Sequence, residues 1–499
     1  MKAKSLIVLS FIYLFLRSIN LTLLPIFNDE SIYLDWGYRT VNLKGQLFYP
    51  LFDAKPPLLM WFFGLSQKIF SDPLFAGRVV SVACGYLTML GIYFLAERHF
   101  GKKTAVFSSL LYIVVPIFSF FDRQALMESA MGAIGVWSLL LFLKLHLKNR
   151  ITDAVCLGLV LAAGFFIKSN GLIYFFSGLL LFTFLSIRSK GKNIDSVNFF
   201  LALLVSQLTL LPLYVQSMFW QTLSSNSRFS LTIGELLRLP SNIWANNLIG
   251  AFEIIFWQMT PLVFFGIIVG IAMILMGKKE ERKWPVFWMT ANFAMVLIFV
   301  RNISPRYMVS FLPLTVVFGG VFFSRLSEKN MFFKLIPFLT TIVAFLGMLV
   351  QIFYPLNYFS GLEKITRFSQ KNEYVTGWPS GYGIVEALSY IDKKSEKGPV
   401  FVGVRVDSGN PENAVITYLR LSDRTNPVYL DRRVFDVDLD TYNCLQSRVP
   451  LYFVSRDNQT AGLEKYLQEL KRFYKPEGKN YVGVYALKHD CRGKTLRLD

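Results

Sequence analysis

The sequence predicts an all-α polytopic membrane domain followed by a small α/β domain. Its 499 residues are 53% hydrophobic, and the mean hydropathy of +0.43 exceeds what the core of a soluble protein of this length requires. About eleven apolar runs are long enough to cross ~30 Å of hydrocarbon as helices. After residue 353 the composition becomes that of a soluble protein. We therefore expect a membrane domain over 1–353, a linker over 354–380 and an α/β domain over 381–499.

The apolar runs define the expected spans. The first is interpreted as a retained helix, because no small-residue cleavage site precedes the charged loop after it. The runs cover approximately residues 5–25, 74–96, 104–121, 125–143, 152–168, 171–187, 197–216, 252–276, 285–301, 306–323 and 332–353.

The basic residues predict the orientation. The net charge is +19, and the first 353 residues hold 30 Lys and Arg against 15 Asp and Glu. Short loops such as "ERHFGKK", "KLHLKNR", "IRSKGKN" and "GKKEERK" carry this excess, as cytoplasmic loops in contact with anionic lipid do. We expect a plasma-membrane protein with its N-terminus inside, and with residues 26–73 and the C-terminal domain outside. A nucleic-acid partner is disfavoured because the charge follows the membrane loops.

The C-terminal part alternates strand-like and helix-like segments. The runs "GPVFVGVRVDS", "NPVYLD", "VPLYFVS" and "NYVGVYALK" are typical of strands, whereas "PENAVITYLRL" and "AGLEKYLQELKRF" carry apolar residues at helical spacing. This alternation predicts a small α/β domain. Its two cysteines, Cys444 and Cys491, have a spacing that does not decide whether they pair.

The first outer loop holds two adjacent carboxylates. In "FNDESIYLDWGYR", Asp29 and Glu30 precede an expected amphipathic helix that stops near Gly45. Charge beside hydrocarbon is costly, so such a pair suggests a functional site. The alternative is that Asn28 or Asp29 caps the helix and Glu30 is a favourable first-turn charge. Downstream, two prolines restrict the backbone of Lys55, which either binds a phosphate or snorkels toward lipid.

A fixed lysine beside a carboxylate suits sugar transfer from a polyprenyl phosphate. The leaving phosphate needs cations, while the acceptor needs a base on the opposite face of the sugar. Lys168 in "FFIKSNGL" and Arg306 in "SPRYMVSFLP" are further cations at outer helix ends. Each is either a snorkelling anchor or part of a phosphate-binding site.

A second outer turn, "SFFDRQALMES", contains Asp122, Arg123 and Glu128. Glu128 lies in an apolar run, where a charge should face the bundle interior or a water-filled cavity. It is either a functional carboxylate or the partner of Arg123 in a structural ion pair.

No metal-binding pattern is visible in the sequence. His99, His146 and His489 are far apart, which disfavours zinc catalysis. A divalent cation held by outer carboxylates is left open by the sequence.

Five segments together resemble the GT-C class of membrane glycosyltransferases, specifically the protein O-mannosyltransferase and aminoarabinose transferase superfamily. They are "NDESIYLDWGYR", "KPPLLMWF", "DRQALMES", "FFIKSNGL" and "SPRYMVSFLP", and the resemblance covers roughly the first 330 residues. It implies a GT-C fold and inverting hexosyl or pentosyl transfer from a polyprenyl-phosphate-linked sugar to an envelope lipid, glycan or protein.

The resemblance also implies roles for single residues. Asp29 would be the base, Glu30 its neighbour, and Lys55 a contact of the donor phosphate. Arg306 and Tyr307 would belong to the donor site, with Asp122 and Glu128 both candidates for the second-loop carboxylate. From their positions at the outer face, and not from the resemblance, Arg123 and Lys168 are further candidate phosphate-binding cations. Ala54 stands where aminoarabinose transferases carry a glutamate associated with a metal, so no metal is carried over. The C-terminal domain does not resemble the MIR repeats of eukaryotic mannosyltransferases, which favours a prokaryotic type.

The alternative from another functional class is a lipid-linked sugar flippase or polysaccharide exporter. Transporters place ionisable groups near the bilayer midplane and often show inverted repeats. In this sequence the ionisable groups gather at the predicted outer face, which favours the enzyme.

Overall fold

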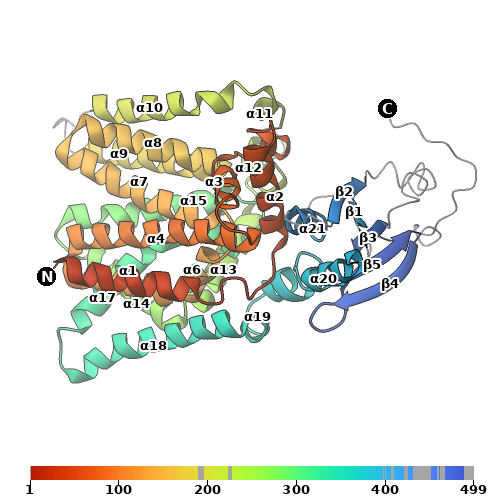
Figure 1. Ribbon diagram of the computed structural model, residues 1–499. Helices are drawn as coiled ribbons and strands as arrows, with labels where there is room; N and C mark the ends of the chain where they lie inside the picture. Colours follow the sequence, from red (N-terminus) through yellow and green to blue (C-terminus); the bar gives the residue numbers. More distant parts are fainter. Residues whose placement is uncertain are drawn as a thin grey trace, which may run out of the picture.

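The computed structural model describes residues 2–188, 196–222, 227–396, 398, 400–405, 409–420, 425–430, 451–457, 460 and 467–487. Figure 1 shows a bundle of roughly aligned helices, with the N-terminus at one end and the C-terminal sheet beyond the other. We call the end that faces the sheet the site end. Cys444 and Cys491 lie outside the described residues.

Helices occupy every apolar run that the sequence predicts. In the described part, five helices are long and apolar enough to cross a membrane, or up to seven if two bent pairs each count as one span. The chain is therefore a multi-pass membrane protein. The bundle helices are α1 (Lys2–Ser18), α4 (Pro73–Phe100), α5 (Lys102–Val114), α6 (Pro116–Asp122), α7 (Glu128–Lys148), α8 (Ile151–Ile167), α9 (Leu172–Arg188), α10 (Ser196–Tyr214), α13 (Ser241–Gln258), α14 (Pro261–Leu275), α15 (Trp284–Phe299), α16 (Pro305–Met308), α17 (Thr315–Leu326) and α18 (Met331–Phe353).

Two predicted spans are not single straight helices. The run at 104–121 bends by 66° between α5 and α6, and the run at 252–276 bends by 114° between α13 and α14. Each second helix begins with a proline, Pro116 or Pro261. Proline lacks the N–H that would continue the preceding helix but is favoured at a first helical position, so the chain restarts there in a new direction.

The site end carries the two helices predicted in residues 26–73, α2 (Asn28–Asn42) and α3 (Leu58–Ser66). They cross at two glycines. A Cβ on Gly37 would lie 2.6 Å from the carbonyl oxygen of Met60, and one on Gly64 would lie 2.0 Å from that of Gly37. Only glycine permits this backbone approach. Smaller helices complete this end: α11 (Ser217–Thr222), α12 (Ile233–Leu237) and α19 (Pro355–Glu363).

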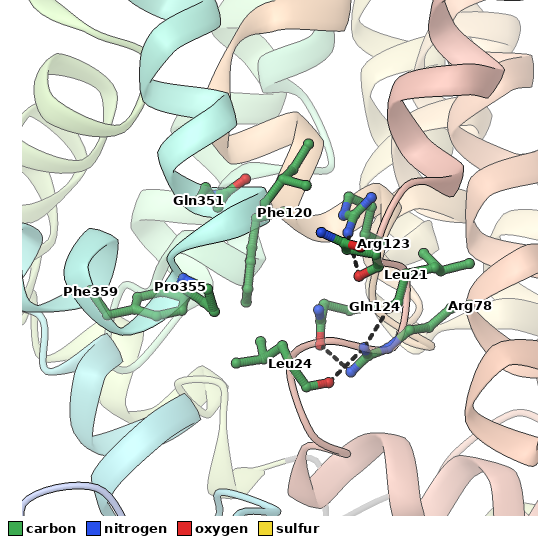
Figure 2. Close-up of a pocket in the computed structure, with 11 residues that line it drawn as sticks. Leu21, Leu24, Arg78, Phe120, Arg123, Gln124, Gln351, Pro355 and Phe359 are labelled. Carbon is green, nitrogen blue, oxygen red and sulfur yellow. Dashed lines mark hydrogen bonds between the residues drawn. The ribbon is translucent and has the colours of Figure 1, made fainter.

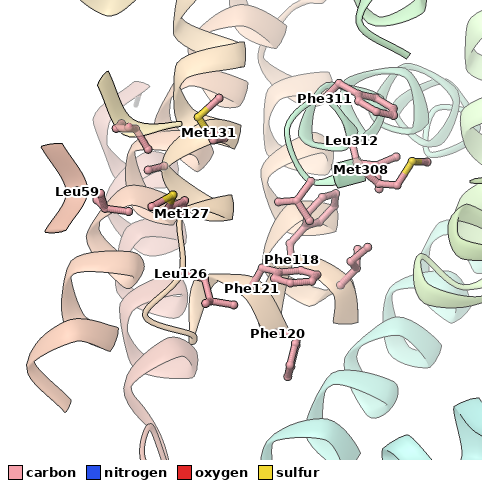
Figure 3. Close-up of a cluster of buried hydrophobic side chains, with 14 of the residues drawn as sticks. Leu59, Phe118, Phe120, Phe121, Leu126, Met127, Met131, Met308, Phe311 and Leu312 are labelled. Atoms are coloured by element: carbon pink, nitrogen blue, oxygen red, sulfur yellow. The ribbon is translucent and has the colours of Figure 1, made fainter. Parts of the chain in front are cut away.

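A dense apolar cluster supports the turn between α6 and α7. Phe118, Phe121 and Met127 are each at most 2% exposed, and they lie near Met308 and Leu312 from the segment around α16. Figure 3 shows these side chains meeting between the helices. Because packed cores tolerate little displacement, this cluster fixes the backbone that carries the second-loop carboxylates.

The C-terminal domain has a five-stranded mixed sheet in the order β2-β1-β3-β5-β4. Strand β1 pairs in parallel with β2 and β3, whereas β5 pairs antiparallel with β3 and β4. The small α/β domain is thus as predicted. Its elements are α20 (Ile384–Ser395), β1 (Val400–Arg405), α21 (Glu412–Leu419), β2 (Thr425–Leu430), β3 (Leu451–Arg456), β4 (Leu467–Tyr474) and β5 (Tyr481–Leu487).

One predicted helix of this domain is wrong. Of the stretch 461–473, the structure describes residues from 467 onward, and these form β4. The pairing of β4 with β5 shifts register between Glu469 and Lys471, as a β-bulge does. The extra residue changes the two-residue alternation into a three-residue spacing of Leu467, Leu470 and Phe473, which imitates a helical pattern.

Candidate active site

Arg306 joins two carboxylates from different parts of the chain. Its Nη1 donates to Asp29 Oδ2 over 2.6 Å, and its Nε donates to Glu128 Oε1 over 3.1 Å. Lys168 Nζ donates to the same Glu128 oxygen over 3.1 Å. We call these four residues the Arg306 cluster. The cluster combines α2, α7, the α8–α9 turn and α16 at the site end.

Asp29 stands at the start of α2 with both carboxylate oxygens engaged. Oδ1 accepts from Asn28 Nδ2 over 3.2 Å and Oδ2 accepts from Arg306. Burial acts to raise the pKa of Asp29, but the charges of Arg306 and Lys55 outweigh it and lower the pKa to about 2. Asp29 is therefore ionised at neutral pH.

Lys55 is held rigidly in the same loop. Its Nζ pairs with Asp53 at 3.0 Å and lies 5.4 and 5.3 Å from the ring centroids of Tyr33 and Trp36. Burial acts to lower the pKa of Lys55, but the surrounding Tyr33, Asp29 and Asp53 produce a net increase. The lysine is thus a permanent cation beside Asp29, with cation–π contacts fixing its position.

Glu30 supports the loop from inside the protein. It is 0% exposed and accepts from Arg78 Nε at 2.8 Å and Nη2 at 2.7 Å. Its oxygens also accept the backbone N–H groups of Phe27 and Ala125. Capping by Asn28 or Asp29 is not observed: α2 begins at Asn28 with Phe27 as the cap residue. Glu30, at the third position of the helix, reaches back to the N–H of Phe27, as an N3 glutamate in a capping box does.

Asp122 lies in the interior of the bundle. It accepts from Tyr13 at 3.0 Å, Arg17 at 3.2 Å, Tyr112 at 2.9 Å and Ser129 at 3.0 Å. These contacts tie α1 to α5, α6 and α7. Of the two second-loop candidates, the structure brings Glu128 into contact with Arg306 and gives Asp122 partners of its own.

The predicted pair of Arg123 with Glu128 is not formed. Arg123 instead donates to the backbone carbonyls of Leu16, Arg17, Ile19 and Asn20, which lie at and just beyond the end of α1. A cation at a helix C-terminus is stabilised in this way. Figure 2 shows Arg123 with Arg78 and Gln124 on one side of a pocket whose other side comes from α18 and α19.

The Tyr307 ring makes a cation–π contact with Lys168. The Lys168 Nζ lies 5.5 Å from the Tyr307 ring centroid, so this ring and Glu128 together fix the lysine.

Two functional candidates were not identified from the sequence. Glu373 lies in a π-helical turn, Asn372–Thr376, within the predicted linker. Burial raises the pKa of Glu373 to about 7, Arg306 opposes this, and Asp29 and Glu128 add to it. No motif marks this carboxylate. Arg78, by contrast, is a charge inside the apolar run at 74–96, a signal that points to a buried partner.

Among the described residues, no group of three or more His, Cys, Asp or Glu is placed to hold a metal ion.

Comparison with known proteins gives a family match over part of the chain and a shared fold over nearly all of it. Residues 54–215 match the family model of dolichyl-phosphate-mannose-protein mannosyltransferases. No curated protein sequence matches significantly.

Solved structures share the fold over almost the whole chain. ArnT from Cupriavidus metallidurans, bound to undecaprenyl phosphate, is 14% identical, with 96% of this chain and 97% of that chain covered and a TM-score of 0.60. The Archaeoglobus fulgidus oligosaccharyltransferase with zinc and sulfate is 15% identical, with 96% and 72% covered and a TM-score of 0.52. AglB of the same organism, with an inhibitory peptide and a dolichol-phosphate, is 14% identical, with 96% and 74% covered and a TM-score of 0.52. With its bundle, its first-loop helices and its C-terminal α/β domain, the chain has the fold of these membrane glycosyltransferase structures.

Proposed function

We propose that this protein is a glycosyltransferase that moves a sugar from a polyprenyl-phosphate-linked donor to an envelope acceptor, with inversion at the anomeric carbon. The observation that carries the proposal is the Arg306 cluster beside Lys55, where the carboxylates of Asp29 and Glu128 and three cations converge at one end of the bundle. The lipid phosphates bound in two similar structures, undecaprenyl phosphate and a dolichol-phosphate, support the donor class.

In the proposed reaction, an acceptor hydroxyl or amine attacks the anomeric carbon. Asp29 takes the proton of the acceptor, and a new bond to the sugar forms. The bond between the sugar and the phosphate oxygen breaks, and the polyprenyl phosphate leaves with the electron pair. Lys55, Arg306 and Lys168 stabilise the charge that develops on this phosphate.

The ion pair between Arg306 and Asp29 couples donor binding to the basicity of Asp29. A bound phosphate competes with Asp29 for Arg306, and the pKa of Asp29 then rises from about 2. Glu128 keeps Arg306 and Lys168 in place while this exchange happens. The base is therefore strengthened when the donor is present.

The basic loops at the opposite end support a site end on the outer side of the cytoplasmic membrane, where lipid-linked donors and envelope acceptors meet. In this role the first-loop helices and the C-terminal domain surround the acceptor.

The test is transfer of a labelled sugar from a polyprenyl-phosphate donor by purified protein. Asp29→Asn should lower the rate by about 10²- to 10⁴-fold, the usual effect of losing a general base. Glu235→Gln is the matched control, because Glu235 is a carboxylate paired with an arginine, Arg301, outside the cluster. Lys55→Met should weaken donor use, whereas Lys68→Met, in the same loop, should not. Full activity of Asp29→Asn contradicts the assignment of the base.

A further inference from the structure

The C-terminal domain reaches the candidate base through one buried residue, Asn410. This residue is 1% exposed, and its backbone N–H donates to Asn28 Oδ1 over 2.8 Å. Its Nδ2 donates to the carbonyls of Ile26, at 3.0 Å, and Pro379, at 2.8 Å. The N–H of Asn28 donates to the same Pro379 carbonyl at 2.9 Å. The start of α2 is thus bonded to the C-terminal domain by backbone and side chain.

These bonds decide which way the Asn28 amide points. A backbone N–H can only donate, so the atom of Asn28 that meets Asn410 must be the oxygen. The amide nitrogen then faces Asp29 and donates to its Oδ1 over 3.2 Å. A chain of two hydrogen bonds therefore runs from Asn410 through Asn28 to Asp29.

The backbone before Asn410 allows this contact only because it carries a glycine. A Cβ on Gly409 would lie 1.8 Å from Asn28 Oδ1, and its φ is +120°. Any side chain at this position would displace the Asn28 amide.

Further contacts hold α2 against the same domain. Asn413 Nδ2 donates to Asp35 Oδ2 at 2.8 Å, and Arg420 pairs with Asp35 as well. The Arg420 guanidinium also lies 4.3 Å from the ring centroid of Tyr38. These contacts fix the axis of α2, whereas the contact with Asn28 acts at its first turn, next to Asp29.

We propose that Asn28, held by Gly409 and Asn410, is a positioning residue for Asp29, so that the C-terminal domain completes the active site. This inference rests on the proposed function. A hydrogen bond from Asn28 orients the carboxylate toward the acceptor and favours its ionised form. The other charged or titratable groups that interact electrostatically with Asp29 are Arg306, Lys55, Tyr33, Tyr307, Glu373 and Tyr374, and Glu128 shares Arg306 with it.

Asn28→Asp separates positioning from docking. The new carboxylate has the shape of asparagine and still accepts from the Asn410 N–H, but it cannot donate to Asp29. We expect a fall in kcat on the order of 10- to 100-fold and a donor KM that changes little, because Lys55 and Arg306 are untouched. The acidic limb of the kcat profile should move to higher pH, since Asp29 loses a donor and gains a negative neighbour.

Gly409→Ala provides a second, independent variant. Its matched control is Gly478→Ala, in the same domain, where φ is +71° and nothing lies within 4 Å of the added Cβ. Both substitutions strain a glycine backbone, but only the first displaces Asn28. We expect Gly409→Ala to reproduce the pH shift and Gly478→Ala to retain the wild-type profile.

The outcomes distinguish this inference from the proposed function. If Asp29→Asn abolishes transfer while Asn28→Asp retains the wild-type kcat and pH profile, positioning by Asn28 is wrong and the base assignment survives. A fall in kcat without movement of the acidic limb also overturns the positioning role. If Asp29→Asn transfers sugar at the full rate, the proposed function itself fails.

Discussion

Arg306 and Asp29 form a direct ion pair, with Nη1 of the arginine 2.6 Å from Oδ2 of the aspartate. This contact is the largest reason that the pKa of Asp29 falls, against the effect of burial, to about 2. Because a carboxyl with a depressed pKa stabilises the fold above its unfolded pKa, that stabilisation is lost as the pH drops from about 4 to about 2.

Arg306→Met should remove the lowering of the Asp29 pKa by Arg306 and should weaken catalysis. Burial then dominates, so the pKa of Asp29 rises and the acidic limb of the transfer rate moves to higher pH, with a large fall in the rate at every pH. The pH profile of sugar transfer is the measurement. Arg301→Met breaks an arginine–carboxylate pair at the same end, with Glu235, and should leave the profile unchanged. An unshifted acidic limb in Arg306→Met would show that the ion pair does not control the base.

Glu30→Gln should damage the fold more than Asp29→Asn does. The substitution leaves the Arg78 guanidinium, which is fully buried, without its charged partner. Removing one member of a buried ion pair costs about 3–5 kcal/mol. Thermal unfolding in detergent, followed by the fraction of monodisperse protein, measures the loss. A Glu30→Gln protein as stable as wild type but inactive would instead assign Glu30 to the chemistry.

Glu373→Gln should change how stability depends on pH. Burial raises the pKa of Glu373 from 4.5 to about 7. A raised carboxyl pKa stabilises the fold fully below its unfolded value, and this stabilisation disappears as the pH rises through the folded value. The unfolding midpoint of wild type should therefore fall between pH 4.5 and 7 relative to that of the variant. A constant difference across this window contradicts the raised pKa.

Gly85→Ala should disturb the packing around Asp122. An added Cβ would lie 2.2 Å from Tyr13 Oη and 2.3 Å from Asp122 Oδ1. Overpacking of a dense interior typically costs about 1–3 kcal/mol, so the unfolding midpoint should drop. Gly361→Ala, in α19, meets nothing within 4 Å and is the control. Equal midpoints for the two variants would mean that the interior around Asp122 adapts without strain.

Sequence length and hydropathy predicted the bundle because each span must cover a fixed thickness of hydrocarbon. They could not predict the turn of 114° before Pro261, since a proline can either kink a helix or start a new one. The bulge in β4 caused the segment to be predicted as a helix, because one extra residue gives Leu467, Leu470 and Phe473 a helix-like spacing.

In the candidate site, too, local sequence predicted some residues but not their tertiary partners. Local motifs identified Asp29, Lys55 and Arg306, which the structure places near one another. Glu30 pairs with Arg78, 48 residues away in the sequence, and Asp29 pairs with Arg306, 277 residues away. Both pairs therefore depend on tertiary structure. Glu373 and Asn410 lie in segments without a motif, and only their position against α2 reveals them.

The hydrogen bond between Asn410 and Asn28 spans 382 positions of the chain. Since a protein is synthesised from its N-terminus, α2 is made long before the residue that fixes its first turn. In the proposed mechanism, a chain still being synthesised and inserted lacks the final element of its active site. Competence for sugar transfer would then arise only when the last domain has folded against the first loop, which makes the end of biosynthesis the moment of activation.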